Sequence, residues 1–222
     1  MAIELYWGSG SPFAWRVMLA LEWKKIPYTS KLINFSKGEH KAPGFIAMNP
    51  RGKVPVLKDG DVTLYETLAI LNYLEKKQPE PALFGRTPAE AAAIWREVSE
   101  CIYYFEQPAF AMIAPVFFGG VNEKVEAIKA AAETLHSELA RIERILTTAN
   151  WLVGNQPSAA DIWWYPETML VERAGANAAA QPLNLDLGSI AKRYPAIGRW
   201  QKRMETQPGY ERTYPPHWKK AA

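Results

Sequence analysis

The sequence is poor in cysteine and histidine, and its apolar residues do not gather into long runs. It has one cysteine, Cys101, and three histidines in 222 residues. One cysteine excludes an internal disulfide, and neither a CxxC nor a zinc-ligand pattern occurs. No apolar stretch is long enough for a membrane helix. The first residues, Met1 to Glu4, lack the basic region and apolar core of a signal peptide. We therefore expect a cytoplasmic protein that holds no metal.

The net charge is also low. A formal charge of +3, scattered along the chain, does not favour nucleic acid or an anionic membrane as a partner. What the chain has is an ordinary apolar fraction of 48% and nine tryptophans. Such side chains supply large apolar surfaces for a core or for ligands.

The first third of the chain alternates between strand and helix patterns. Apolar, β-branched runs predict four strands, and apolar residues at helical spacing predict two longer helices. Ser11 before Pro12 matches a helix N-cap followed by proline at the first helical position. The order predicts a small mixed sheet of the thioredoxin-like type. The expected strands are 3–7, 28–33, 54–57 and 62–65, and the helical segments are 12–24, 44–48 and 66–77.

The strand signal ends at a proline-rich connector. Residues 79–88 contain prolines at 79, 81 and 88 and are a candidate domain boundary. The remainder, 89–222, predicts an all-helical bundle, with a long amphipathic helix over 123–148. Pro108 and Pro115 are expected to kink or break a helix. We therefore divide the chain into an α/β domain (1–78), a linker (79–88) and an all-helical domain (89–222).

The segment from Asn49 to Leu57 is the most unusual stretch of the first domain. It reads as a strand that contains Pro55, and proline cannot donate to a sheet ladder. The backbone of Val54 is then free to pair with an extended, peptide-like ligand at the sheet edge. A cis Val54–Pro55 bond is a reasonable expectation. The alternative is an ordinary edge strand in which proline blocks aggregation.

Together, four stretches resemble the soluble glutathione transferase family over nearly the whole chain. They are Ser11-Pro12-Phe13 before Arg16-Val17, Asn49 to Leu57, Glu66-Thr67 before Ala69-Ile70, and Gly154 with Ser158 to Ile162. The resemblance implies a thioredoxin-like domain followed by a helical domain, in a homodimer. It also implies glutathione as co-substrate, whose thiolate is added to a hydrophobic electrophile. The motifs mix features of the theta, zeta and tau types, all of which use serine.

Ser11 is the candidate catalytic residue that the resemblance implies. Its hydroxyl, at the positive end of a helix, can donate to the glutathione sulfur and stabilise the thiolate. The alternative is that Ser11 only caps the helix. Ser9, which follows Gly8 as in delta-type members, and Tyr6 on the first strand are rivals for this role.

The resemblance also implies how the rest of glutathione is held. The N-terminus of the helix at Glu66-Thr67 can bind the γ-glutamyl carboxylate, and Glu66 can take its ammonium group. Val54 is expected to pair with the cysteinyl backbone, and a cation is needed for the glycyl carboxylate. The complete candidate set is Ser11, Phe13, His40, Lys41, Lys53, Val54, Pro55, Glu66 and Thr67, in which the two lysines and the histidine are the possible cations.

Several residues of the helical half receive other roles. An electrophile pocket is expected to be lined by Tyr103, Phe110, Ile113, Phe117, Phe118, Trp163 and Trp164, although such aromatic stripes are more often core. Ser158 and Asp161 predict a capping box, a folding device. Cys101 is expected to be a buried small hydrophobe. Residues 214–218 are a candidate cover for the site.

Two other functions remain open on the sequence. One is a glutathione-dependent isomerase, ether-cleaving enzyme or peroxidase on the same scaffold. Zeta-type isomerases carry Ser-Ser-Cys where this chain has Ser11-Pro12-Phe13, which weakens the isomerase option. The other is a non-catalytic glutathione-binding scaffold, against which the joint presence of Ser11, Val54-Pro55 and Glu66-Thr67 argues.

Overall fold

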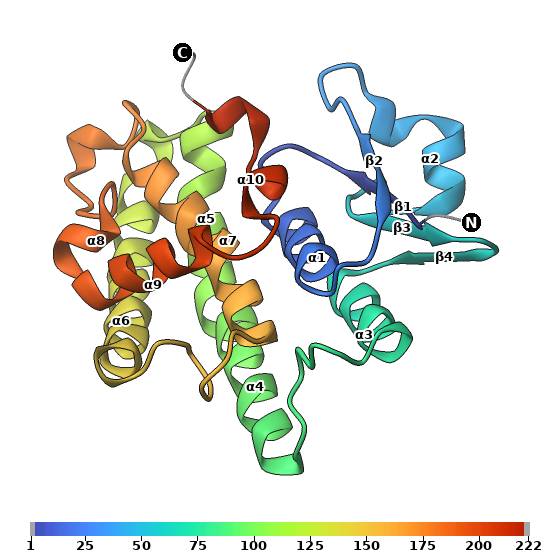
Figure 1. The fold of residues 1–222 in the computed structure, drawn as a ribbon. Helices are drawn as coiled ribbons and strands as arrows, with labels where there is room; N and C mark the ends of the chain where they lie inside the picture. Colours follow the sequence, from blue (N-terminus) through green and yellow to red (C-terminus); the bar gives the residue numbers. More distant parts are fainter. Residues whose placement is uncertain (1–2, 220–222) are drawn as a thin grey trace. The chain divides into compact units, whose positions relative to one another are not determined.

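The computed structural model describes residues 3–219, which form two compact units. Among the described residues, the first unit contains 3–83 together with the C-terminal segment 207–219, and the second contains 84–206. The sequence analysis assigned 207–219 to the helical domain instead. Figure 1 shows the fold coloured along the chain.

The first unit is built on a four-stranded mixed sheet of order β2-β1-β3-β4. Strand β1 pairs parallel with β2 and antiparallel with β3, and β3 pairs antiparallel with β4. A parallel pair needs a crossover connection, which the first helix supplies. The strands are β1 (Ile3–Trp7), β2 (Tyr28–Leu32), β3 (Val56–Asp59) and β4 (Val62–Tyr65).

Helices cover both faces of this sheet. Figure 1 shows α1 (Pro12–Trp23) and α3 (Thr67–Lys77) on one side and α2 (Pro43–Met48) on the other. Every residue of α1 except Phe13 is buried, and apart from Arg16 and Glu22 the buried residues are uncharged and mostly apolar, as in core helices. On the opposite face, Phe45 of α2 packs edge-on against Tyr6 at a ring distance of 6.4 Å. A short 3-10 turn, η1 (Glu39–Lys41), precedes α2.

The C-terminal segment of the first unit lies along α1. It contains α10 (Tyr210–Thr213) and the 3-10 turn η5 (Pro216–Trp218). The indole Nε1 of Trp15 donates to Thr213 Oγ1 at 2.9 Å, and the Trp15 ring meets that of Trp218 edge-on at 5.5 Å. Arg212 also forms an ion pair with Glu22 of α1.

The second unit is helical. Its elements are α4 (Pro88–Glu100), η2 (Cys101–Phe105), α5 (Glu106–Phe118), η3 (Asn122–Lys124), α6 (Val125–Thr148), α7 (Ala159–Gly175), η4 (Gln181–Leu183), α8 (Ile190–Arg193) and α9 (Pro195–Glu205). The fold class expected from the sequence is therefore confirmed: an α/β thioredoxin-like unit and an all-α unit.

Two details differ from the expected elements. The strand expected from Val54 begins instead at Val56, because the chain joins the ladder only after Pro55. Pro115 does not break α5, which runs to Phe118. The π-helical turn η2 stands directly before α5: the N–H of Glu106 donates five residues back, to the carbonyl of Cys101. Because α4, η2 and α5 follow one another without a gap, Pro108 does not break the helical stretch either; it lies just after the π-helical turn.

The capping box expected at the start of α7 is present. Ser158 Oγ accepts from Ala160 N at 3.2 Å, and Asp161 Oδ2 accepts from Ser158 N at 2.9 Å. The second carboxylate oxygen of Asp161 accepts from Leu152 N at 3.0 Å and from Trp200 Nε1 at 2.9 Å. Asp161 therefore joins the loop before α7 to the core of the unit. Its burial raises its pKa to about 6.

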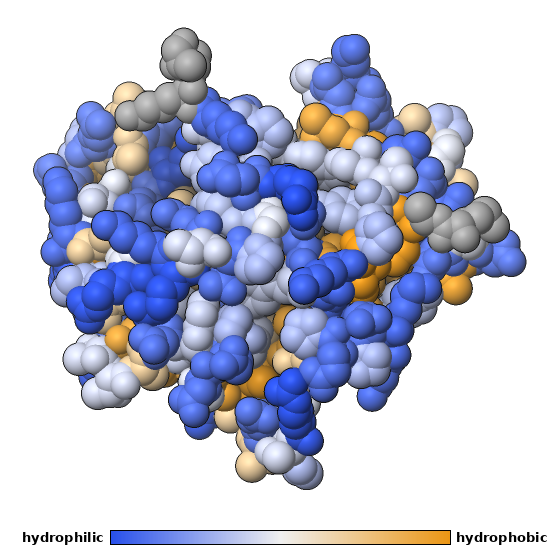
Figure 2. Space-filling model, viewed as in Figure 1, coloured by the Kyte–Doolittle hydropathy of each residue, from blue (hydrophilic) through white to orange (hydrophobic). Residues whose placement is uncertain are grey.

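The face seen in Figure 2 is mainly hydrophilic. Figure 2 shows several separate hydrophobic areas among hydrophilic residues on the visible face. No helix of residues 3–219 has the length and apolar character that crossing a bilayer requires.

Candidate active site

Three loops of the first unit meet at one end of the sheet, where the central strands β1 and β3 and the edge strand β4 end or begin. Strand β1 ends at Trp7, β3 begins at Val56 and β4 ends at Tyr65, and the register pairs Tyr6 with Val56 and Val56 with Tyr65. The segments 8–11, 54–55 and 66–67 therefore leave the sheet side by side. These are the segments in which the sequence analysis placed the thiol-activating serine, the peptide-pairing backbone and the γ-glutamyl site.

Ser11 is the N-cap residue of α1, and the capping hydrogen bond orients its hydroxyl. Its Oγ accepts from the backbone N–H of Ala14 at 3.3 Å, and its backbone is extended, as an N-cap requires. The side chain is partly exposed. A hydroxyl that accepts from an amide keeps its own proton for a ligand. The positive end of the α1 dipole adds to the attraction for an anion at this position.

The two rival hydroxyls are engaged elsewhere. Ser9 Oγ lies 2.6 Å from His217 Nδ1 of the C-terminal segment. Tyr6 is on the α2 side of the sheet and donates to Glu4 Oε2 at 3.1 Å. Burial, together with this hydrogen bond, raises the pKa of Tyr6.

The backbone of Val54 lies outside the sheet ladder. Pairing of β3 starts at Val56, and the Val54–Pro55 peptide bond is cis, as expected. A Cβ at Gly8 would clash with the ring of Phe35 and lie 3.3 Å from Val54 Cγ2. The turn after β1 thus approaches Val54 closely, and only a residue without a side chain fits there.

Glu66 and Thr67 begin α3 beside the Ser11 segment. Thr67 Oγ1 donates to the carbonyl of Phe13 at 3.3 Å. Glu66 has a φ of 69°, a left-handed conformation that is costly for a residue with a side chain. Its carboxylate is exposed and lies 3.7 Å from the guanidinium of Arg51. Arg51, which the sequence analysis did not single out, is thus a second charged group near this site.

The three candidate cations lie in two adjacent loops. A Cβ at Gly52 would be 3.1 Å from the carbonyl of His40, so the 39–41 turn packs against the residue before Lys53. His40 is partly buried, its ring meets that of Phe35 at 5.1 Å, and its Nδ1 is buried without a hydrogen-bond partner among the described residues. Lys41 and Lys53 are exposed. The structure therefore brings all three near Val54 without selecting one.

The aromatic residues proposed for the electrophile separate into two groups. Tyr103 and Phe110 are 68% and 66% exposed and can contact a ligand. Phe117 is 36% exposed and Phe118 is 84% exposed. The buried group consists of Ile113, Trp163 and Trp164.

Trp164 is best described as core. It is fully buried, its Nε1 donates to the carbonyl of Glu97 at 2.9 Å, and its ring packs on that of Phe105 at 4.9 Å. Trp163 is 3% exposed and donates to Glu106 Oε1 at 2.8 Å. The sequence pattern could not separate core from lining, because both use aromatic residues on one helix. Cys101 is buried, as expected.

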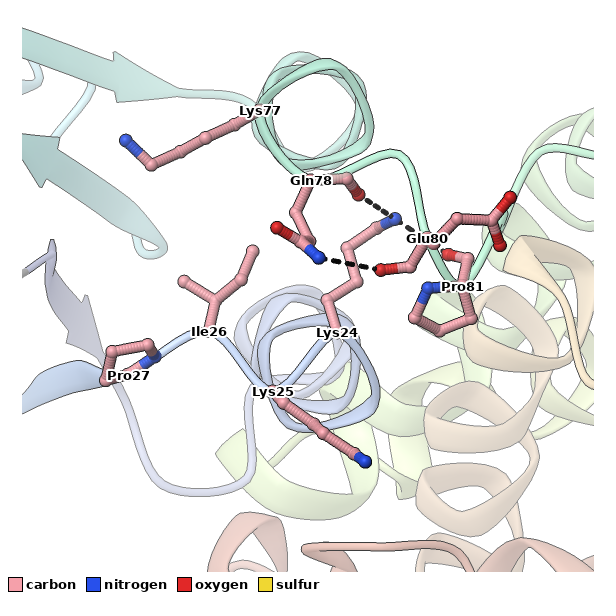
Figure 3. A pocket seen from close by; sticks show the side chains of 8 residues that line it. All are labelled: Lys24, Lys25, Ile26, Pro27, Lys77, Gln78, Glu80 and Pro81. Carbon is pink, nitrogen blue, oxygen red and sulfur yellow. Dashed lines mark hydrogen bonds between the residues drawn. The ribbon is translucent and has the colours of Figure 1, made fainter.

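A hollow on the first unit lies away from these loops. A pocket of about 630 Å³ is lined by the C-terminal ends of α1 and α3 and by the following loops, from Lys24 to Pro27 and from Lys77 to Pro81 (Figure 3). Lys24 Nζ donates to the carbonyls of Gln78 and Pro81 at 2.6 and 2.8 Å. It also forms a 2.6 Å ion pair with Glu75. Because its charge is used in this way, Lys24 joins α1 to the end of α3 and is not a ligand site.

Metal ligands do not gather in the described part of the chain: residues 3–219 contain no cluster of three or more His, Cys, Asp or Glu side chains suited to an ion. The three loops present hydroxyl groups, backbone amides and charged side chains.

Comparison with known proteins agrees with this architecture. Residues 10–77 match the model of the glutathione S-transferase N-terminal domain, and residues 106–208 match that of the C-terminal domain. The chain therefore belongs to the glutathione S-transferase family.

Individual relatives span almost the whole chain. Glutathione S-transferase A of Pleuronectes platessa is 32% identical over 97% of this chain and 92% of its own length. A maleylacetoacetate isomerase of Pseudomonas aeruginosa is 28% identical over 88% of this chain and 93% of its own length. The crystal structure of a glutathione S-transferase from the Antarctic clam Laternula elliptica has a TM-score of 0.80 at 31% identity, covering 100% of this chain and 95% of its own.

Proposed function

We propose that the protein is a glutathione transferase in which Ser11 stabilises the glutathione thiolate for attack on a hydrophobic electrophile. The observation that supports this most is the state of the Ser11 hydroxyl. It accepts from Ala14 N at the start of α1, and so can offer its proton to a sulfur anion. The rival hydroxyls of Ser9 and Tyr6 have partners of their own.

The energetic requirement on Ser11 is modest. A free thiol has a pKa of about 8.5, and lowering it by about two requires near 2.7 kcal/mol of preferential stabilisation of the anion. A hydrogen bond from a hydroxyl to a charged acceptor contributes about 1.5–3 kcal/mol. The dipole of α1 adds up to about 1 kcal/mol. In the reaction, the thiolate forms a bond to the electrophilic carbon and the leaving group departs with its electron pair.

The rest of glutathione is held by the two neighbouring loops. Val54, outside the ladder, offers its N–H and C=O to the cysteinyl backbone. The first amides of α3 receive the γ-glutamyl carboxylate, joined by the Thr67 hydroxyl when its proton turns away from the carbonyl of Phe13, while Glu66 takes the ammonium group. The left-handed conformation of Glu66 supports this, because strained residues concentrate at ligand sites. His40, Lys41 or Lys53 supplies the charge for the glycyl carboxylate.

The electrophile is expected to contact exposed aromatic residues of the helical unit. Tyr103 and Phe110 are the strongest candidates, since each leaves about two thirds of its surface open. Phe117, with a smaller exposed fraction, is a weaker one. Further exposed aromatics, Trp95 and Tyr104, favour a homodimer, because large apolar side chains are commonly covered by a second copy. A cytoplasmic location completes the proposal.

The decisive test combines binding with turnover. The protein should be retained on immobilised glutathione and should conjugate chlorodinitrobenzene. Ser11→Ala should lower turnover by at least about tenfold while retaining the fold. Ser9→Ala and Tyr6→Phe should each lower turnover by less than this tenfold. Turnover that survives in Ser11→Ala but collapses in Ser9→Ala would transfer the role to Ser9.

An isomerase is the second candidate. It is favoured by the similarity to proteins named maleylacetoacetate isomerase, one of which is 28% identical over 88% of this chain. Isomerisation would use the same thiolate, added to the substrate and then eliminated. Maleylacetoacetate should therefore be assayed beside chlorodinitrobenzene. Retention on glutathione without turnover of any substrate would instead support a scaffold protein.

A further inference from the structure

The C-terminal segment reaches the turn that carries Ser11. Its position along α1 is set by the Trp15–Thr213 hydrogen bond and by the packing of Trp218 on Trp15. Trp218 is 9% exposed, so its indole is almost wholly buried. These contacts place His217, the residue before Trp218, over residues 9 and 10.

His217 meets this turn through a hydrogen bond and a close approach. Its Nδ1 lies 2.6 Å from Ser9 Oγ. A Cβ at Gly10 would lie 2.8 Å from His217 Cε1 and 3.3 Å from its Nε2, and the φ of Gly10 is +83°. The turn therefore accommodates the imidazole only because residue 10 has no side chain and can adopt a left-handed conformation.

We propose that His217 is a positioning residue of the thiol site, which holds the Gly8–Ser11 turn through Ser9 and thereby aims the Ser11 hydroxyl at the sulfur. The proposal rests on the assignment of Ser11 made above. Ser11 N donates to Gly8 O at 3.1 Å, so Ser9 and Gly10 are the two central residues of one tight turn. Fixing the side chain of one central residue restricts the whole turn.

Such restriction matters because the donor must be placed accurately. A hydroxyl stabilises a thiolate only at hydrogen-bond distance and with its proton directed at the sulfur. A misplacement of about 1 Å in a catalytic group can cost about a hundredfold in rate. A turn held by its own backbone bond and by one cap can be expected to sample several arrangements, and the His217 contact removes some of them.

The same contact separates the two serines chemically. Ser9 and Ser11 lie two positions apart, and both hydroxyls are at the end of the sheet where the thiol is expected. In the tautomer whose Nδ1 accepts, His217 takes the Ser9 proton, and Ser11 is left as the donor. In that tautomer the first of the two serines does not compete for the sulfur.

The test measures the thiol of bound glutathione directly. The ultraviolet absorbance of the thiolate, titrated with pH, gives its pKa in complexes of the full-length protein with glutathione. The variants are His217→Phe, which keeps the ring shape, Ser9→Ala, the double variant, and His217→Asn, whose amide can take the place of Nδ1. For each variant, turnover of chlorodinitrobenzene and the KM for glutathione are measured in addition to the thiol pKa.

We expect His217→Phe and Ser9→Ala each to reduce the thiolate population at neutral pH, and kcat with it, by about three- to fivefold. The KM for glutathione should stay within about twofold, because the peptide-binding loops are untouched. The double variant should lose no more than either single variant, since both remove one interaction. His217→Asn should recover most of the loss. Lys219→Ala, an exposed change in the same segment, is the matched control and should be unaffected.

The outcomes separate this proposal from the one on which it rests. An unchanged thiol pKa in both His217→Phe and Ser9→Ala, with Ser11→Ala raising it, would overturn the role of His217 and leave Ser11 in place. An unchanged thiol pKa in Ser11→Ala would overturn the assignment of Ser11 itself. If tryptophan fluorescence shows that His217→Phe releases the segment, Ser9→Ala decides, because it keeps the Thr213 and Trp218 anchors.

Discussion

Trp15 and Thr213 are 198 positions apart in the sequence and are joined by a buried hydrogen bond of 2.9 Å. Thr213 Oγ1 in turn donates to the carbonyl of Tyr210 at 2.8 Å. The threonine hydroxyl thus accepts from the helix that begins at the thiol site and donates within α10. This bond makes residues 207–219 part of the first unit.

Replacing Thr213 by valine tests the worth of that bond. Thr213→Val keeps the volume but removes this acceptor of the buried Trp15 Nε1, which should cost about 1–3 kcal/mol. Urea unfolding followed by tryptophan fluorescence measures it as a lower midpoint. Thr213→Ser retains the hydroxyl and should lose clearly less. Equal losses in the two variants would show that the hydrogen bond contributes no more than the methyl group.

The start of α3 should control glutathione affinity. Thr67→Val and Glu66→Gln should each raise the KM for glutathione by about tenfold, since a bond to a charged group is lost, while kcat changes little. Thr67→Ser should behave like the parent protein. Glu126→Gln, an exposed change on α6, serves as the charge control. A fall in kcat without a change in KM would place these residues in the chemical step instead.

The cation for the glycyl carboxylate can be identified by altering the ligand. Glutathione whose glycyl carboxylate is converted to an amide should bind the parent protein more weakly. The variant that removes the responsible cation, among His40→Gln, Lys41→Met and Lys53→Met, should bind both forms alike. Isothermal calorimetry supplies the affinities. If all three variants still discriminate between the ligands, the charge comes from another residue.

Asp161 should give a specific pH dependence of stability. Burial raises its pKa to about 6 in the folded protein, above the ordinary value of 3.8. Between these values the folded state binds more protons than the unfolded state, so this group's contribution to stability falls as the pH rises. The free energy of unfolding of the parent minus that of Asp161→Asn should decrease by up to about 3 kcal/mol from pH about 4 to pH about 6.

The stability of Asp161→Asn also depends on the hydrogen bonds that the Asp161 carboxylate accepts. Asp161→Asn should be the less stable protein throughout, because one amide cannot accept from the Ser158, Leu152 and Trp200 donors together. A difference that grows with rising pH would mean that the hydrogen bonds outweigh burial and that the carboxylate is ionised throughout this range.

The buried Glu97 and the partly exposed Arg141 form an ion pair in the helical unit, and breaking it should be costly. Glu97 Oε2 accepts from Arg141 Nη1 at 2.9 Å, and Glu97 is 1% exposed. Arg141→Met should cost about 1–3 kcal/mol, because the buried carboxylate then keeps only the exposed Arg96, 3.2 Å away, as an ion-pair partner. Adding Glu97→Met should restore much of the loss. Thermal unfolding of the two variants measures both steps, and additive losses would contradict the pairing.

The sequence by itself determined the elements whose signals are local. Ser11 before Pro12 marked the start of α1, and Ser158 with Asp161 marked the start of α7, since a cap is made within four positions along the chain. The spacing of apolar residues, which differs between strands and helices, distinguished the α/β region from the all-helical region. The order of strands and helices then restricted the topology, and the three loops of the site follow from that topology.

Only the tertiary structure decided the relations between distant residues. In the structure, His217 contacts Ser9, and residues 207–219 belong to the first unit. Trp164, a candidate for the electrophile pocket, is fully buried in the core. Glu66 has a left-handed backbone conformation, and β3 begins two residues after the position expected from the sequence. No local pattern encodes these features, because each depends on which surfaces pack together once the chain has folded. A histidine near the end of the chain has no sequence signal that relates it to a serine 208 positions earlier.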